Sequence, residues 1–210
     1  FASFTLPLLV VIIVVQGGLF AAIDVTAGEK ERGTLEALLV TPATDVQVMI
    51  GKLLAVFTLA VVPYILTLLG FWIAGRLLPE SMKLGGDLPF SVIGVAILVG
   101  IPTALFMSVI QMAISVRTKT FKDAQAAAAP LSIGALLPAF AAGVIQPQSL
   151  LAYLIPVYGP AALVGQMTIN GGILDASALG MVIIGSLLAA VIAFVIAMRL
   201  FNRERLLYAV

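Results

Sequence analysis

Charged residues are scarce in this sequence. They make up 10% of its 210 residues, whereas hydrophobic residues make up 62%. A soluble globular domain carries roughly 25% charged residues, so this chain has too few to cover a surface that faces water. The net charge of +1 gives no indication of a nucleic-acid partner. We therefore expect an integral membrane protein and no binding to nucleic acid.

Cysteine and histidine are both absent. Without cysteine there is no disulfide framework and no thiolate metal site. Without histidine the chain lacks the commonest metal ligand and general base, which excludes HExxH zinc proteolysis and Ser-His catalysis. The pair Gly51-Lys52 has no upstream glycine at P-loop spacing, so we expect no nucleotide site of that kind. The sequence predicts no catalytic residues, no metal ligands and no bound cofactor.

Long apolar runs dominate what is present. A membrane-spanning helix needs about 20 mostly apolar residues. Five stretches meet this requirement: Phe4–Ile23, Leu53–Gly75, Phe90–Val116, Ala124–Val144 and Ala176–Met198. The predicted fold is all-α, a polytopic transmembrane helix bundle of about five spans over residues 1–210.

The stretch from Gln146 to Asp175 is apolar but is interrupted by prolines and by the pair Gly171-Gly172. These residues break a straight helix. We expect an extracellular re-entrant or interfacial hairpin over residues 146–175, because irregular backbone at membrane depth must be buried in protein or line a wet cavity. A sixth span is the alternative.

The basic residues are distributed unevenly between the loops. Nine of eleven fall on one side if successive loops alternate across the membrane: Lys30, Arg32, Lys52, Arg117, Lys119, Lys122, Arg199, Arg203 and Arg205. The positive-inside rule assigns that side to the cytoplasm, together with the C-terminus. The start of the chain then faces outward without a visible signal peptide, so we expect that a preceding span is missing. A natural start after processing is the alternative.

Residues 24–52 carry the densest charge and form the predicted cytoplasmic loop. Leu35, Leu38 and Leu39 share one helical face, and Arg32 and Glu36 have the spacing of an exposed ion pair. This pattern predicts a short amphipathic helix that docks a partner or lies at the interface. An ordinary solvated loop explains the same periodicity.

Two capping residues bound this short helix. Thr34 follows Gly33 and is expected to cap the helix at its start, and Pro42 is expected to end it. Thr44 and Gln47 have capping-box spacing for the helix that enters the second span.

Mid-span polar residues are few. No Asp, Glu, Lys or Arg lies near the centre of a predicted span, which lowers the probability of a proton or ion relay. Gln16 and Gln111 are the most polar mid-span side chains and are candidates for a substrate path. Interhelical hydrogen bonding is the other interpretation of both.

The charged loop also carries a resemblance to a known family. Its residues are similar to the cytoplasmic motif of type-2 ABC exporter permeases, and closest to the bacterial sodium-export and multidrug-export group. The residues concerned are Glu29, Lys30, Glu31, Arg32, Gly33, Thr34, Leu35, Glu36, Leu38, Leu39 and Pro42. The family normally has a span before this start, and often a large extracellular domain; neither is present in this sequence.

The resemblance implies a role for this segment. It would be the coupling helix that meets a cytoplasmic ABC ATPase, with Mg-ATP bound and hydrolysed on that partner. It also implies a second permease copy or a related half-permease, an inner (plasma) membrane location and export as the function. A secondary transporter or channel without an ATPase, and a membrane assembly or scaffold protein, are the competing functions.

Overall fold

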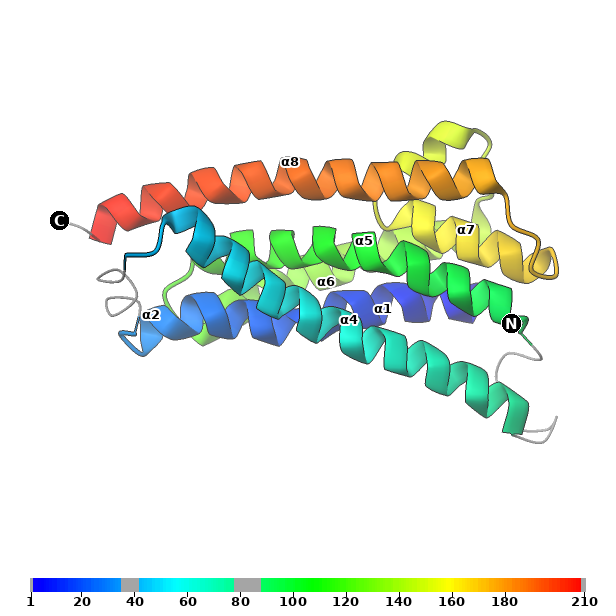
Figure 1. The fold of residues 1–210 in the computed structure, drawn as a ribbon, viewed down its shortest axis with the longest axis horizontal. Helices are drawn as coiled ribbons and strands as arrows, with labels where there is room; N and C mark the ends of the chain where they lie inside the picture. The colour runs from blue at the N-terminus through cyan, green and yellow to red at the C-terminus, as the bar shows by residue number, and fades with distance from the viewer. Residues whose placement is uncertain (1, 35–41, 78–87, 209–210) are drawn as a thin grey trace.

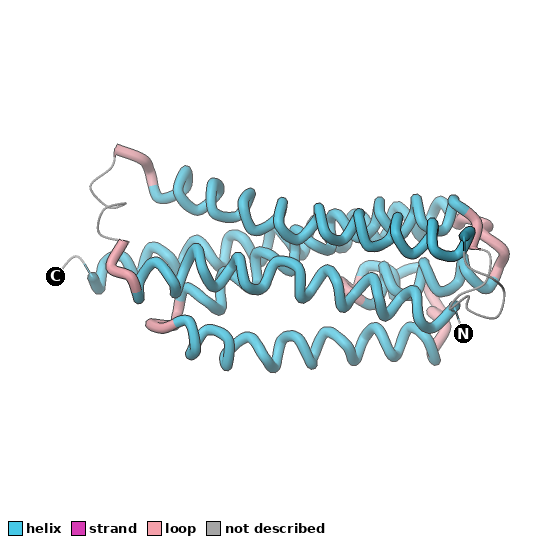
Figure 2. Tube along the Cα trace, turned by 90° about the horizontal axis from the view of Figure 1, so that it is seen from below, coloured by secondary structure: helices cyan, strands magenta, loops and turns pink. Residues whose placement is uncertain are grey.

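The computed structural model describes residues 2–34, 42–77 and 88–208, and in these ranges every regular element is a helix. The elements are α1 (Ala2–Ile23), η1 (Asp24–Gly28), α2 (Glu29–Glu31), α4 (Asp45–Leu77), α5 (Phe90–Val116), α6 (Phe121–Val144), η3 (Leu150–Leu154), α7 (Tyr158–Ile169) and α8 (Ala176–Tyr208). Figure 1 shows them as an elongated bundle, and in Figure 2 the connecting loops lie at its two ends. The all-α polytopic fold is confirmed.

Five of the helices are long and apolar enough to cross a membrane, as the sequence predicts. Their ends differ from the predicted span ends. The first runs on to Glu31, and α4 begins at Asp45 rather than near Leu53. At 1.5 Å per residue, the 33 residues of α4 and of α8 extend about 50 Å, well beyond a hydrocarbon core of about 30 Å. Hydropathy therefore located the five apolar spans but not the ends of the helices that contain them.

Helices α1 and α5 form the centre of the bundle. Burial covers 56% of the apolar window of α1 and 61% of that of α5, against 22%, 17% and 28% for α4, α6 and α8. The outer helices expose large apolar side chains such as Leu66 on α4, Leu137 on α6 and Val191 on α8. Hydrocarbon tails are as apolar as these side chains, so such a surface is stable in a bilayer.

Small residues on the central helices α1 and α5 allow α4 to approach each of them closely. A Cβ atom added at Gly17 of α1 would lie 3.2 Å from the carbonyl oxygen of Ala60 on α4. A Cβ atom added at Gly100 of α5 would overlap the ring of Tyr64, a fully buried side chain of α4. The Tyr64 hydroxyl donates to the Ala96 carbonyl oxygen, which satisfies its polar atom inside the bundle.

The segment between α6 and α8 begins and ends at the same end of the bundle, where α7 packs inward (Figure 1). Most of α7 is buried, and it contacts α1, α5 and α6. Its 12 residues rise about 18 Å, too little to cross the membrane as a sixth span. The Tyr158 hydroxyl donates to the Ile145 carbonyl oxygen at 2.9 Å and ties the segment to the end of α6. The extracellular re-entrant assignment of residues 146–175 stays a prediction.

Candidate functional site: the charged junction at the α2 end

Those charged residues of the predicted motif that the structure describes meet at one end of the bundle, which we call the α2 end. This end holds α2, the turn between α5 and α6, and the C-terminal turns of α8 (Figure 1). The nine basic residues counted above all belong to segments at this end, whereas Arg76 lies in the last turn of α4 at the other end. The basic residues that the structure describes are therefore divided between the two ends as the loop count predicts.

The motif begins on the first membrane helix rather than in a separate loop. Helix α1 passes into the π-helical turn η1 and then into α2, with Ile23, Gly28 and Glu29 all in right-handed helical conformation. The Thr26 hydroxyl donates to the Ala22 carbonyl oxygen at 2.6 Å across this wider turn. Residues 24–31 of the predicted loop thus form an extension of α1, and displacement of α2 would be carried directly into that helix.

Glu29 links this extension to α4. Its carboxylate forms an ion pair with Lys52, whose ammonium group also donates to the Val25 carbonyl oxygen at 2.6 Å. The Lys52 side chain is 9% exposed and that of Glu29 is 26% exposed. A cation buried to this degree is stable only when it is paired and hydrogen-bonded, so the charged form of Lys52 requires the Glu29 carboxylate.

Lys30 reaches the C-terminal end of α5. Its ammonium group donates to the Val116 carbonyl oxygen and, at 3.4 Å, to that of Thr118. These carbonyls have no partners within the helix, and the negative end of the helix dipole adds to their attraction for a cation. The Lys30 side chain therefore caps α5.

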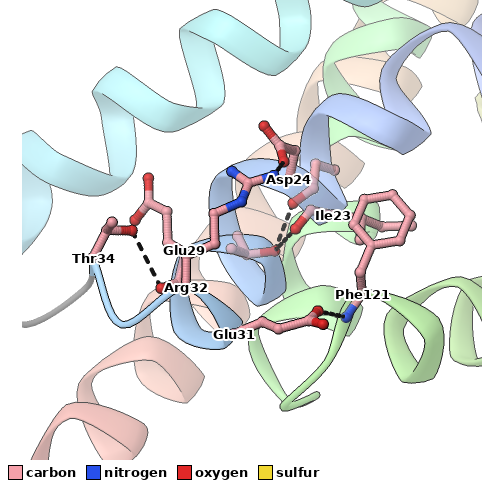
Figure 3. Close-up of polar contacts among 9 residues, drawn as sticks. Ile23, Asp24, Glu29, Glu31, Arg32, Thr34 and Phe121 are labelled. Atoms are coloured by element: carbon pink, nitrogen blue, oxygen red, sulfur yellow. Dashed lines mark hydrogen bonds and ion pairs between the residues drawn. The ribbon is translucent and has the colours of Figure 1, made fainter.

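Glu31 reaches the N-terminal end of α6. Its carboxylate accepts a hydrogen bond from the backbone N–H of Phe121 at 2.7 Å, as Figure 3 shows. Thr120 accepts from the Asp123 N–H at 3.2 Å and caps the same turn. An anion at a helix N-terminus is favourable because unpaired N–H groups and the dipole face it. Three successive residues, 29–31, thus bind three different helices.

Arg32 pairs with Asp24 at 2.6 Å on the exposed face of the same helix (Figure 3). The predicted Arg32–Glu36 pair reaches residues outside the described ranges. Because both Arg32 and Asp24 are largely exposed, the contact is worth about 1 kcal/mol at most.

Gly33 and Thr34 end the helix. Gly33 adopts φ +70°, and its N–H donates to the Lys30 carbonyl oxygen at 3.2 Å while the Thr34 N–H donates to that of Glu29 at 3.0 Å. This pair of bonds is a Schellman motif, which explains the glycine. The Thr34 hydroxyl also donates to the Glu29 carbonyl oxygen, so it closes the preceding helix.

The apolar part of the predicted coupling helix, with Leu35, Glu36, Leu38 and Leu39, lies outside the described residues, and its docking role stays a prediction. The chain after it confirms the predicted capping box. The Thr44 N–H donates to the Gln47 side-chain oxygen at 2.9 Å, and the Gln47 N–H donates to the Thr44 hydroxyl at 3.3 Å.

The two glutamines predicted as pathway candidates do not meet. Gln111 is fully buried, and its amide donates to the Val15 carbonyl oxygen of α1 at 2.6 Å. Gln16 is exposed on the bundle surface. Gln111 therefore makes the interhelical hydrogen bond that was the other interpretation. Its role in a substrate path stays a prediction, as does that of Gln16.

Sequence reasoning missed the internal partners of the motif. Lys30 was counted for orientation and named in the family motif, and Lys52 was counted for orientation. Neither was assigned an internal partner, although they bind α5 and Glu29. One signal was available: Lys52 lies at the edge of an apolar run, where a lysine needs an anionic partner. Nothing in the sequence pairs Glu31 with the N-terminus of α6, because 90 residues separate Glu31 from Phe121.

Two comparisons with known proteins bear on this arrangement. The family model described as ABC-2 family transporter protein matches residues 1–199. The ABC transporter permease protein NatB of Bacillus subtilis (strain 168) is 36% identical over 141 residues, a match that covers 66% of this chain and 36% of the relative. The match thus spans about a third of that relative's length. No solved structure matches the chain.

Proposed function

Because the chain belongs to the ABC-2 family of transporter proteins, and so is a multi-pass membrane component of an ABC transporter, we propose that it is the permease of an exporter. In this proposal a separate cytoplasmic ABC ATPase binds and hydrolyses Mg-ATP, and the permease moves substrate out of the cytoplasm. A second permease copy or a related half-permease completes the pathway.

The observation that carries the proposal is the charged junction at the α2 end. Glu29, Lys30 and Glu31 bind α4, α5 and α6, and they are continuous with α1. A force applied to the adjoining residues 35–41 would therefore reach four of the five membrane helices through a few polar contacts. Such a device changes the state of the bundle only if these contacts differ between the inward-open and outward-open states.

The orientation supports placing the ATPase at this end. All nine basic residues of the loop count lie at the α2 end, and the positive-inside rule assigns that end, with the C-terminus, to the cytoplasm. An ATPase in the cytoplasm would then meet the segment that follows Gly33.

The competing functions are less well supported. A secondary transporter commonly carries an ionisable residue in the middle of a span. In the described spans the charged side chains lie near the helix ends, with Lys52 and Arg76 on α4 and Arg199 on α8. Stable binding without flux would indicate a scaffold instead.

Docking and transmission can be tested separately. In the full-length permease co-purified with its ATPase, Leu38→Asp and Leu39→Asp should abolish co-purification. Each substitution loses about 1.5–3 kcal/mol of apolar burial and introduces an unpaired charge. Glu29→Gln should preserve co-purification but lower transport and the ATP hydrolysis that transport stimulates in liposomes. Lys122→Gln, which alters a nearby exposed cation, serves as the control.

Wild-type docking and coupled hydrolysis in both leucine variants would contradict the ATPase proposal. Normal coupling in Glu29→Gln would contradict the transmission role alone, because docking through the leucines does not require that carboxylate. Transport that continues without nucleotide would favour the secondary transporter.

A further inference from the structure

A groove of about 640 Å³ opens on the outer surface of the bundle at the α2 end. Helix α5 forms its floor, α8 forms one wall, and α6 contributes Ala127 to its edge. The lining is almost wholly apolar, with Phe106, Ile110, Ile114, Ile192 and Ile196 prominent. It adjoins the charged junction at Thr118, a lining residue whose carbonyl oxygen accepts a hydrogen bond from Lys30.

One charged residue, Arg117, belongs to the lining in the described part of the chain. Arg117 follows the last residue of α5 and is exposed. No acidic side chain in the described ranges pairs with its guanidinium group. The groove thus combines a long apolar trough with a single unpaired cation at its mouth.

The length of the trough matches one leaflet of a bilayer. The part of α5 from Phe106 to Arg117 rises about 16 Å at 1.5 Å per residue. Half of a hydrocarbon core of about 30 Å is about 15 Å. With Arg117 at the membrane surface, the deep end of the groove at Phe106 therefore lies close to the bilayer midplane.

We propose that this groove binds one anionic phospholipid, with an acyl chain between α5 and α8 and the phosphate on Arg117. A guanidinium group binds a phosphate through two parallel hydrogen bonds. A zwitterionic headgroup carries its own cation beside the phosphate, so it neutralises the charge of Arg117 less completely than an anionic headgroup does. Basic pockets between membrane helices on the cytoplasmic side bind anionic headgroups in this way. A second protein copy packed into the groove would bring no anion to Arg117 from its apolar surface.

Two further cations extend the favourable field without lining the groove. Lys119 lies in the α5–α6 turn, and Arg199 lies in α8 beside Leu200, which does line it. Both are exposed at the α2 end. They attract anionic lipid to this surface generally, whereas Arg117 is positioned to select it for the groove.

Lipid binding is measured by fluorescence quenching in the full chain. The single tryptophan, Trp72, is changed to phenylalanine, and Phe106→Trp then places a reporter at the deep end of the groove. Vesicles of phosphatidylcholine receive a small fraction of brominated phosphatidylglycerol or brominated phosphatidylcholine as quencher. A reporter at Leu59, exposed on α4 away from the groove, is the matched control.

The Phe106→Trp reporter should be quenched about fivefold more effectively by brominated phosphatidylglycerol, the factor that one cation near an anionic surface supplies. Arg117→Gln should remove this preference, while Lys119→Gln should retain most of it. The Leu59→Trp reporter should show little preference.

Three results would overturn the assignment. Equal quenching of the groove reporter by both lipids would show that the groove does not select anionic lipid. An equal loss of preference in Lys119→Gln and Arg117→Gln would show that the preference for anionic lipid comes from general surface charge and not from the groove. A groove reporter that neither lipid quenches, beside a normally quenched control, would show that protein, such as a second copy, covers the groove.

Discussion

The ion pair between Glu29 and Lys52 gives the sharpest test of the charged junction. In Glu29→Gln, Lys52 keeps its hydrogen bond to the Val25 carbonyl oxygen but loses its anion while only 9% exposed. Breaking a fully buried pair costs 3–5 kcal/mol, but Glu29 is about a quarter exposed and water screens the pair. We therefore expect a loss of about 1.5–3 kcal/mol in the free energy of unfolding, the range for a hydrogen bond to a charged group.

The reverse substitution should cost less. In Lys52→Met the buried cation is replaced by an apolar side chain, and the more exposed Glu29 carboxylate can turn toward water. The loss should be about 1 kcal/mol or less. The double variant should be more stable than Glu29→Gln alone, because no unpaired buried cation remains.

Thermal unfolding in detergent, followed by Trp72 fluorescence at one scan rate, measures these differences. A change of 1 kcal/mol shifts Tm by about 2–4 °C in a chain of this size, so Glu29→Gln should melt about 3–12 °C lower. If Lys52→Met were as destabilising as Glu29→Gln, or if the two losses simply added in the double variant, the pair would not be the stabilising contact inferred here.

Two further predictions concern topology and packing. The chain has no cysteine, so single cysteines can be introduced as reporters. Cysteines at Gln148 and Ser177 should both react with an impermeant thiol reagent on intact cells, while one at Lys119 should be protected. Labelling of Lys119→Cys would reverse the predicted orientation, and protection of Ser177→Cys alone would show that residues 146–175 cross the membrane. Gly100→Ala should destabilise the bundle by about 1–3 kcal/mol, since its Cβ atom overlaps the buried tyrosine ring of α4, whereas Gly94→Ala on the same helix has open space and should stabilise by up to about 1 kcal/mol. Equal melting temperatures for these two variants would show that the close approach of the helices is not required.

The sequence by itself determined the features that depend on local chemistry. Apolar length gave the five membrane helices, the loop charges predicted which segments share an end, and spacing predicted the Thr44–Gln47 capping box. Each depends on residues close together in the chain, so no knowledge of packing was needed. The motif at residues 29–39 indicated the family for the same reason, since it is a contiguous pattern.

Only the tertiary structure decided which helices lie inside the bundle. The most apolar window, Ala176–Leu200, has a mean hydropathy of 2.8 but is 28% buried, whereas Phe90–Val116, at 2.4, is 61% buried. Lipid is as apolar as a protein interior, so hydropathy does not distinguish a lipid-facing helix from a central one. The partners of Lys30 and Glu31 were equally hidden, because they lie 86 to 90 residues away and include backbone groups that any sequence supplies.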